Sequence, residues 1–201
     1  MNWFRENPLK VFLVVLIVVV ASIATVHAYF KLLFPQAGPR VSITSPPLEF
    51  SMELDKAEYA SEENIKITFL LRNISNQTIT VGKPSLWPIS NDITTEAYGV
   101  HIPQGQHLLR ARHFDFAITA SNGTEVFKEF GGVLQMTYDI VLEPDGYIKQ
   151  TLVWIPFSNL PLEVPYHLFK GTYQIRGIQF CGIPGLGLIT LETPSITFII
   201  K

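Results

Sequence analysis

Alternation of apolar and polar residues constrains the fold of this chain more than any other feature. In two segments every second residue is large and apolar: Leu48, Phe50, Met52 and Leu54, and then Ile65, Ile67, Phe69 and Leu71. Successive side chains of a β-strand point to opposite faces, so a period of two predicts strands that each bury one face. No segment after residue 30 shows the longer period of an amphipathic helix.

The same pattern predicts further short strands along the chain. They cover Thr78–Val81, Phe114–Ile118, Val126–Phe130, Leu134–Leu142, Tyr147–Ile155, Thr172–Phe180 and Ser195–Ile200. Asn122-Gly123 predicts a hairpin turn because both residue types tolerate positive φ, and Glu143–Gly146 predicts a second turn. We therefore predict an all-β fold, an immunoglobulin-like antiparallel two-sheet sandwich.

The segment Pro84–Arg110 has no clear period and predicts a loop or one short edge strand. Long loops often carry function, so this segment and the later aromatic segments are the places where we expect partner-binding residues. Aromatic side chains next to prolines suit a stiff binding loop. The candidates are Trp87, Pro88, Trp154, Phe157 and Tyr166. The alternative for Trp87 and Trp154 is that they close the ends of the core.

The N-terminal residues 11–30 contain no Asp, Glu, Lys or Arg. As a helix rising ~1.5 Å per residue they reach roughly 30 Å, enough to cross a bilayer core. Arg5 and Lys10 precede this segment, which favours a cytoplasmic N-terminus and an extracytoplasmic C-terminal domain. The alternative is a secretory signal cleaved after Val26-His27-Ala28.

These features predict three parts of the chain. Residues 1–34 form a transmembrane anchor, or an uncleaved signal, that contacts the lipid bilayer through residues 11–30; residues 35–47 form a proline-rich spacer. Residues 48–201 form the extracytoplasmic β-sandwich domain. The predicted localisation is therefore the cell membrane, with a single pass.

Charge and cysteine content narrow the function classes. Of 15 basic and 17 acidic residues, Arg5, Lys10, Lys31 and Glu6 precede the domain, which leaves 12 basic and 16 acidic residues and a formal charge of −4. This balance offers no basic footprint for nucleic acid. The single cysteine, Cys181, excludes an intramolecular disulfide, and we expect it to be buried and inert.

Three Asn-x-Ser/Thr triplets mark possible glycosylation sites on the extracytoplasmic side. They begin at Asn73, Asn76 and Asn122. All three lie in predicted turns, and Asn and Ser also occur in turns simply because their side chains bond to nearby backbone groups.

No catalytic motif and no cofactor motif is found. The sequence lacks G-x-S-x-G, and its Gly-rich stretch 182–187 has no Lys for a phosphate cradle. His101, His107 and His113 are the local concentration of metal-ligating side chains, but their spacing matches no H-x-x-x-H motif. A metal site built from these loop histidines remains an alternative hypothesis.

Several segments resemble the BsuPI-type intracellular proteinase inhibitor domain, an immunoglobulin-like sandwich family. They are Ile67–Val81, His113–Ile118, Asn122-Gly123 with Glu125–Phe127, Leu142–Tyr147 and Lys170–Ile175, within residues 54–179. The resemblance implies the same sandwich fold and, by analogy, inhibition of a serine protease. The chain departs from the family in carrying a predicted membrane segment and a longer segment at 84–110.

We therefore predict a non-enzymatic interaction module that binds another protein or serves as a subunit of an envelope assembly. Two other hypotheses stay open. One is an inhibitor of an extracytoplasmic serine protease, and the other is a metal-binding protein that uses the loop histidines.

Overall fold

The computed structural model describes residues 12–13, 15–23, 25, 38–85, 93–102, 114–128, 136–154 and 168–201. The chain divides into two compact units, Met1–Ala37 and Gly38–Lys201.

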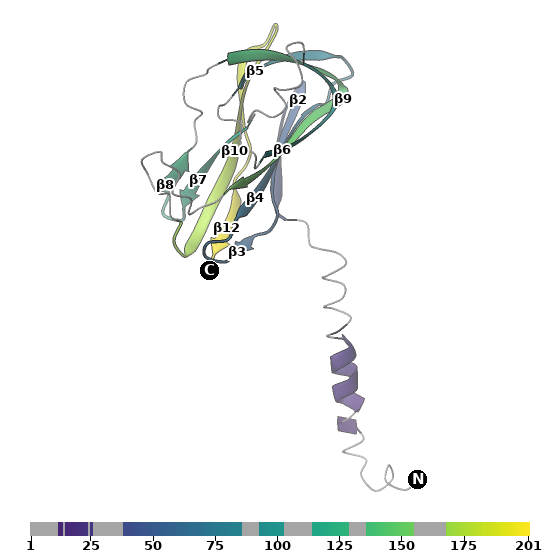
Figure 1. Cartoon of the computed structure of the whole chain (residues 1–201), viewed down its shortest axis with the longest axis vertical. Helices are drawn as coiled ribbons and strands as arrows, with labels where there is room; N and C mark the ends of the chain where they lie inside the picture. The colour runs from purple at the N-terminus through teal and green to yellow at the C-terminus, as the bar shows by residue number, and fades with distance from the viewer. Residues whose placement is uncertain are drawn as a thin grey trace. The chain divides into compact units, whose positions relative to one another are not determined.

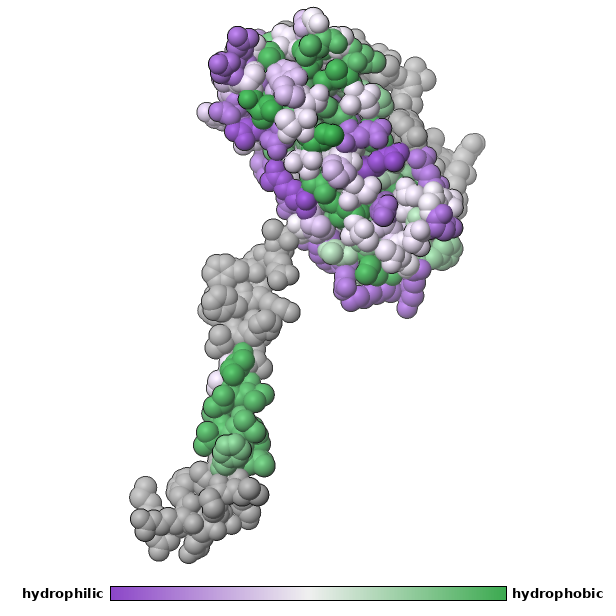
Figure 2. All heavy atoms as spheres, turned by 180° about the vertical axis from the view of Figure 1, so that it is seen from behind, coloured by the Kyte–Doolittle hydropathy of each residue, from purple (hydrophilic) through white to green (hydrophobic). Residues whose placement is uncertain are grey.

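The described residues of the first unit are helical and almost entirely apolar. All their large apolar side chains are exposed, and the face seen in Figure 2 is hydrophobic. The hydroxyls of Ser22 and Thr25 donate to carbonyl oxygens one turn earlier, at 2.7 and 2.8 Å, so neither is left without a partner. Within the described residues, no helix has both the length and the hydropathy needed to span a membrane.

The second unit is built of strands, which confirms the all-β prediction (Figure 1). The described strands are β1 (Arg40–Ser45), β2 (Leu48–Leu54), β3 (Glu58–Tyr59), β4 (Ile65–Asn73), β5 (Ile79–Ser85), β6 (Ile93–His101), β7 (Asp115–Ala120), β8 (Glu125–Lys128), β9 (Met136–Trp154), β10 (Gly171–Ile183), β11 (Gly187–Glu192) and β12 (Ile196–Ile200).

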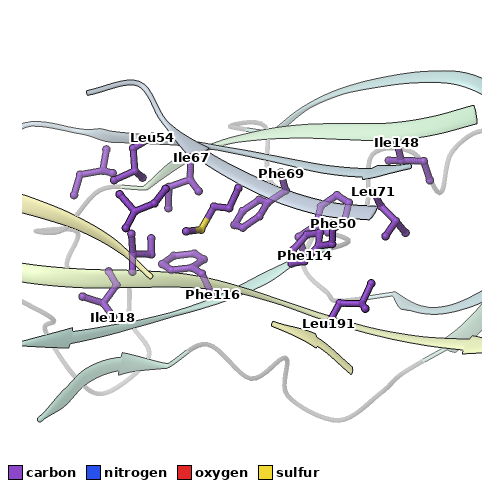
Figure 3. Close-up of a cluster of buried hydrophobic side chains, with 14 of the residues drawn as sticks. Phe50, Leu54, Ile67, Phe69, Leu71, Phe114, Phe116, Ile118, Ile148 and Leu191 are labelled. Carbon is purple, nitrogen blue, oxygen red and sulfur yellow. The ribbon is translucent and has the colours of Figure 1, made fainter. Parts of the chain in front are cut away.

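Hydrogen bonds join these strands into one curled sheet with the order β1-β2-β4-β9-β5-β10-β12-β3, to which β6, β7, β8 and β11 add at the sides. Among the described strands, only β3 and β12 pair in parallel. A single pair, Gly82 with Gly182, links β5 to β10. The sheet curls so that β2 and β4 face β7 and β10 across the core (Figure 3).

The sequence prediction of two strands with a turn at Glu143–Gly146 is wrong, because β9 runs unbroken from Met136 to Trp154. Its first half pairs with β5 and its second half with β4, while β6 pairs with both halves. The turn residues instead bend the strand, and Asp145 adopts the left-handed region at φ 61. A bend within one long strand lets one backbone serve both parts of the curled sheet.

Other strands differ from the prediction at the edges. The predicted spacer 35–47 overlaps β1, which pairs with β2 along its whole length. The segment 84–110 contains β6, a strand of nine residues, in line with the edge-strand alternative. The predicted turn at Asn122-Gly123 is confirmed: it joins β7 to β8, and Gly123 has φ 85.

Much of the core consists of the apolar residues that the alternation predicts, but Tyr59 of β3, Ile102, Leu168 and Leu191 of β11 lie in it outside the predicted strands. The rings of Phe50, Phe69 and Phe114 stack at centroid distances of 5.5 to 6.2 Å (Figure 3). Gly177 of β10 lies against them, since a Cβ there would come within 3.1 Å of the Phe50 ring. Cys181 is fully buried, as expected.

Candidate interaction surface

A bend shared by β6 and β9 shapes the outer face of the sheet. Gly99, at φ 58, lies against Gly146, and a Cβ on Gly146 would lie only 2.5 Å from the Gly99 carbonyl oxygen. Real Cβ atoms do not approach that closely, so only glycine allows the two backbones to meet here. The residues beside these glycines, Tyr98 and Tyr147, are thereby brought opposite each other.

Tyr98 and Tyr147 form an aromatic pair on the solvent side of the sheet. Their ring centroids are 6.0 Å apart with an interplanar angle of 29°, the stacked arrangement that aromatic pairs favour. Tyr98 is 64% exposed, whereas the rings of the core are hidden from solvent. The pair therefore offers aromatic surface that the fold itself does not use.

Two ion pairs flank the tyrosines. The Arg72 guanidinium lies 2.6 Å from the Asp145 carboxylate, and the Lys149 ammonium lies 3.0 Å from Glu96. Exposed pairs of this kind add little to stability, but each cancels its own charge. We call the six residues Tyr98, Tyr147, Arg72, Asp145, Glu96 and Lys149 the tyrosine surface.

The register extends this surface across five strands. Tyr98 on β6 is opposite Tyr147 on β9, which is opposite Arg72 on β4; Glu49 on β2 and Thr44 on β1 complete the row. Directly opposed residues of antiparallel strands point to the same face. The row is therefore a strip across the outer face of the sheet, with aromatic rings at one end and polar side chains toward the other.

Asn73 braces the bend from the side of the core. Its side chain is fully buried, and its amide nitrogen lies 2.8 to 3.1 Å from the carbonyl oxygens of Gln77, Leu142 and Glu143. Its oxygen accepts from the backbone N–H and the hydroxyl of Ser75. The amide that glycosylation would modify is thus occupied in the fold, whereas Asn76 and Asn122 are exposed.

The predicted partner-binding residues are only partly covered by the structure. Trp87, Pro88, Phe157 and Tyr166 lie outside the described residues. Trp154 is half-buried and packs against Phe116 and Phe127, at centroid distances of 5.8 and 5.2 Å, which favours the alternative that it closes the core.

The histidines are likewise divided. His101 is exposed on β6, while His107 and His113 lie outside the described residues. Among the residues that the structure describes, no group of three or more His, Cys, Asp or Glu is placed to hold a metal ion. The metal hypothesis therefore depends on His107 and His113, which lie outside the described residues.

Sequence reasoning missed the tyrosine surface altogether. The signal it could have used is a pair of dipeptides, Tyr98-Gly99 and Gly146-Tyr147, each joining an aromatic residue to a glycine. A glycine within a strand often marks a bulge or a close backbone approach. The sequence does not show, however, that these two dipeptides lie side by side.

Comparisons with known proteins place the chain in no family. No family profile matches it, and no curated protein does. Among solved structures it is similar to the C-terminal domain of wzt, at 9% identity and a TM-score of 0.42 over 84% of this chain and 83% of that one.

Two further structural similarities are weaker. Spo0M, a sporulation control protein from Bacillus subtilis, gives 10% identity and a TM-score of 0.35 over 78% of this chain and 50% of that one. AvmM, which catalyses macrocyclization in alchivemycin A biosynthesis, gives 10% identity and a TM-score of 0.36. The similarity covers 78% of this chain and 90% of that one. At such values the similarities say nothing about what this chain does.

Proposed function

We propose that the chain is a membrane-anchored, extracytoplasmic interaction module that binds another protein through the tyrosine surface. The observation that carries this proposal is the Tyr98–Tyr147 pair on the outer face of the sheet, with Tyr98 64% exposed and Tyr147 half-buried. Tyrosine is enriched at the centres of protein interfaces, where a few residues carry most of the binding energy. Side chains held on strands lose little freedom on binding, which favours affinity.

The charges around the tyrosines support the same proposal. Interface centres are poor in unpaired charge and are surrounded by a polar rim. Beside the rings, the charge of Arg72 is neutralised by Asp145 and the charge of Lys149 by Glu96. A partner that covers Tyr98 and Tyr147 would therefore meet these four charged side chains as ion pairs. It would not have to remove water from a charge that has no counter-ion among them.

The membrane part of the proposal rests on the N-terminal segment. Residues 11–30 carry no charge, and the described part is a helix whose large apolar side chains are exposed. A helix that is apolar all round needs a non-aqueous environment. We propose one pass with the N-terminus in the cytoplasm, followed by an immunoglobulin-like sandwich outside.

A tagged pull-down tests the partner-binding surface. The full-length protein would be solubilised gently from its native membrane and recovered through a C-terminal tag. We expect a reproducible protein partner with the unaltered chain and its loss with Tyr98→Ala/Tyr147→Ala. The matched control is Phe169→Ala, because Phe169 is an aromatic residue that is 78% exposed, precedes β10 and is not part of the tyrosine surface.

Three results would count against the proposal. Recovery of the protein alone would exclude a stable partner, and equal recovery with the double tyrosine variant would exclude this surface. The anchor is tested separately by alkaline extraction of membranes. We expect the full chain to stay in the membrane fraction and a chain lacking residues 1–30 to be released; release of both would refute the anchor.

A further inference from the structure

Residues 184–188, at the turn between β10 and β11, form an apolar tip. Residues 184–188 are all exposed, with Leu186 at 59% and Leu188 at 78%. Gly185 and Gly187 have φ 85 and 81, and a Cβ added to either would meet nothing within 4 Å. The turn therefore stands clear of the described remainder of the domain, and Figure 2 shows hydrophobic side chains gathered at this end.

The tip also carries no charge. No Asp, Glu, Lys or Arg occurs from Phe180 to Leu191. Its backbone is internally bonded: the Leu186 N–H donates to the Ile183 carbonyl at 2.9 Å, and the β10–β11 ladder begins with the pair Ile183–Gly187. An uncharged segment costs less to remove from water than a charged one, and these backbone hydrogen bonds lower that cost further.

The size of the tip decides which partner fits. Two leucines and the turn that holds them are far smaller than the roughly 1,200–2,000 Å² that a stable protein interface buries. Burying a leucine is nevertheless worth about 1.5–3 kcal/mol, enough for shallow, reversible insertion into a bilayer. A lipid surface needs neither the area nor the matched polar groups that a protein partner would need.

The tip lies at the end of the domain away from its first residues. The Leu54 N–H bonds to Pro39 at 3.1 Å, which fixes the chain entry beside the end of β2. The tip instead follows Gly182, which pairs with Gly82 of β5. In Figure 1 the β10–β11 turn and the C-terminus accordingly lie at opposite ends of the domain. The tip is therefore a contact separate from the covalent attachment to the N-terminal segment.

We propose that the β10–β11 turn inserts Leu186 and Leu188 into the apolar edge of a lipid bilayer. This inference rests on the proposed function only in that both take the protein to act at a membrane. It does not involve the tyrosine surface, which lies on the outer face of β6 and β9.

Spin labels on the full-length protein test the insertion. A nitroxide would be attached at Leu188→Cys or, as a matched control on the same face of β11, at Glu192→Cys, which is about 13 Å further along at roughly 3.3 Å per residue. Cys181 is fully buried, so labelling of the unaltered chain gives the background. The protein would be mixed with phosphatidylcholine vesicles and recovered by flotation.

The readout is collision of the nitroxide with lipid-soluble oxygen and with a water-soluble nickel chelate. We expect the label at 188 to favour oxygen several-fold over the label at 192, and Leu186→Ser to reduce that preference. The proposal is overturned if the label at 188 favours the chelate as the label at 192 does, or is shielded from both reagents as in a protein contact. Protein that does not float refutes both anchor and tip, whereas floating protein with a water-exposed label refutes the tip alone.

Discussion

Strands β4 and β9 carry different aromatic residues on the inner and outer faces of the sheet. Inside, Phe69 is almost completely buried against other phenylalanines; outside, Tyr147 stacks on the exposed Tyr98. A phenylalanine ring has no polar atom to satisfy, so it can be buried completely, whereas a tyrosine hydroxyl keeps contact with water or a partner. The comparison shows that the inner rings hold the fold together and leaves the outer pair available for binding.

The polar residues of the inner face sharpen this contrast. Gln150 is buried opposite Phe69, and its amide nitrogen donates to the Thr95 hydroxyl at 2.9 Å. Asn73 is buried with its amide bonded to three carbonyl oxygens. These two polar side chains are tolerated inside because the structure supplies their partners, whereas polar side chains outside can bond to water.

The largest effect should come from the inner face. Phe69→Ala removes a ring that stacks on three others, and we expect it to lower the free energy of unfolding by about 3–5 kcal/mol. Leu70→Ala, one position along but half-buried on the outer face, should cost much less. Urea unfolding of both variants measures the difference, and equal losses would break the distinction between the faces.

The next effect should come from the buried amide. Asn73→Ala leaves the carbonyl oxygens of Leu142 and Glu143 without their side-chain donor, and we expect a loss of about 2–3 kcal/mol. Asn76→Ala, which changes an exposed asparagine three residues later, should stay within about 0.5 kcal/mol. Chemical unfolding measures both, and a similar loss for both variants would contradict the bracing role of Asn73.

A smaller effect concerns pH. Burial, together with the hydrogen bond and charge of Asp55, raises the pKa of Tyr59 above its ordinary value. In the unfolded chain this hydroxyl ionises near pH 10, about where a free tyrosine does. The stability that Tyr59 contributes is therefore complete below about pH 10 and is lost as the pH rises further.

Unfolding midpoints from pH 8 to 11 test this. Tyr59→Phe should flatten the alkaline decline, with a residual slope from Tyr173, whose pKa is also raised by burial. At neutral pH the variant should lose about 1 kcal/mol, because it lacks the 2.7 Å hydrogen bond to Asp55. An unchanged alkaline slope would show that Tyr59 is not the group responsible.

The smallest effect on stability should come from the outer pair. Tyr98→Ala removes one cross-strand aromatic contact, which we expect to cost about 1 kcal/mol or less. The same change should weaken partner binding strongly in the pull-down described above. Thermal unfolding alongside the pull-down separates the two readouts, and a large loss of stability would assign the pair to the fold.

The sequence by itself determined the local features. Alternation in 48–54 and 65–71 predicted β2 and β4 with the correct residues inward, and Asn122-Gly123 predicted the β7–β8 hairpin. These predictions succeed because side-chain period and turn chemistry depend on residues close together in the chain.

Only the tertiary structure decided what depends on distant pairing. The continuity of β9 comes from β6 bridging both of its halves, and β1 becomes a strand because β2 offers it an edge. Tyr98 and Tyr147 meet because Gly99 and Gly146 approach closely from different strands, and Asn73 is buried because the bend closes over it. Periodicity assigns a residue to a face, but which strands lie side by side is set by packing of the whole sheet, so the candidate surface was invisible in the sequence.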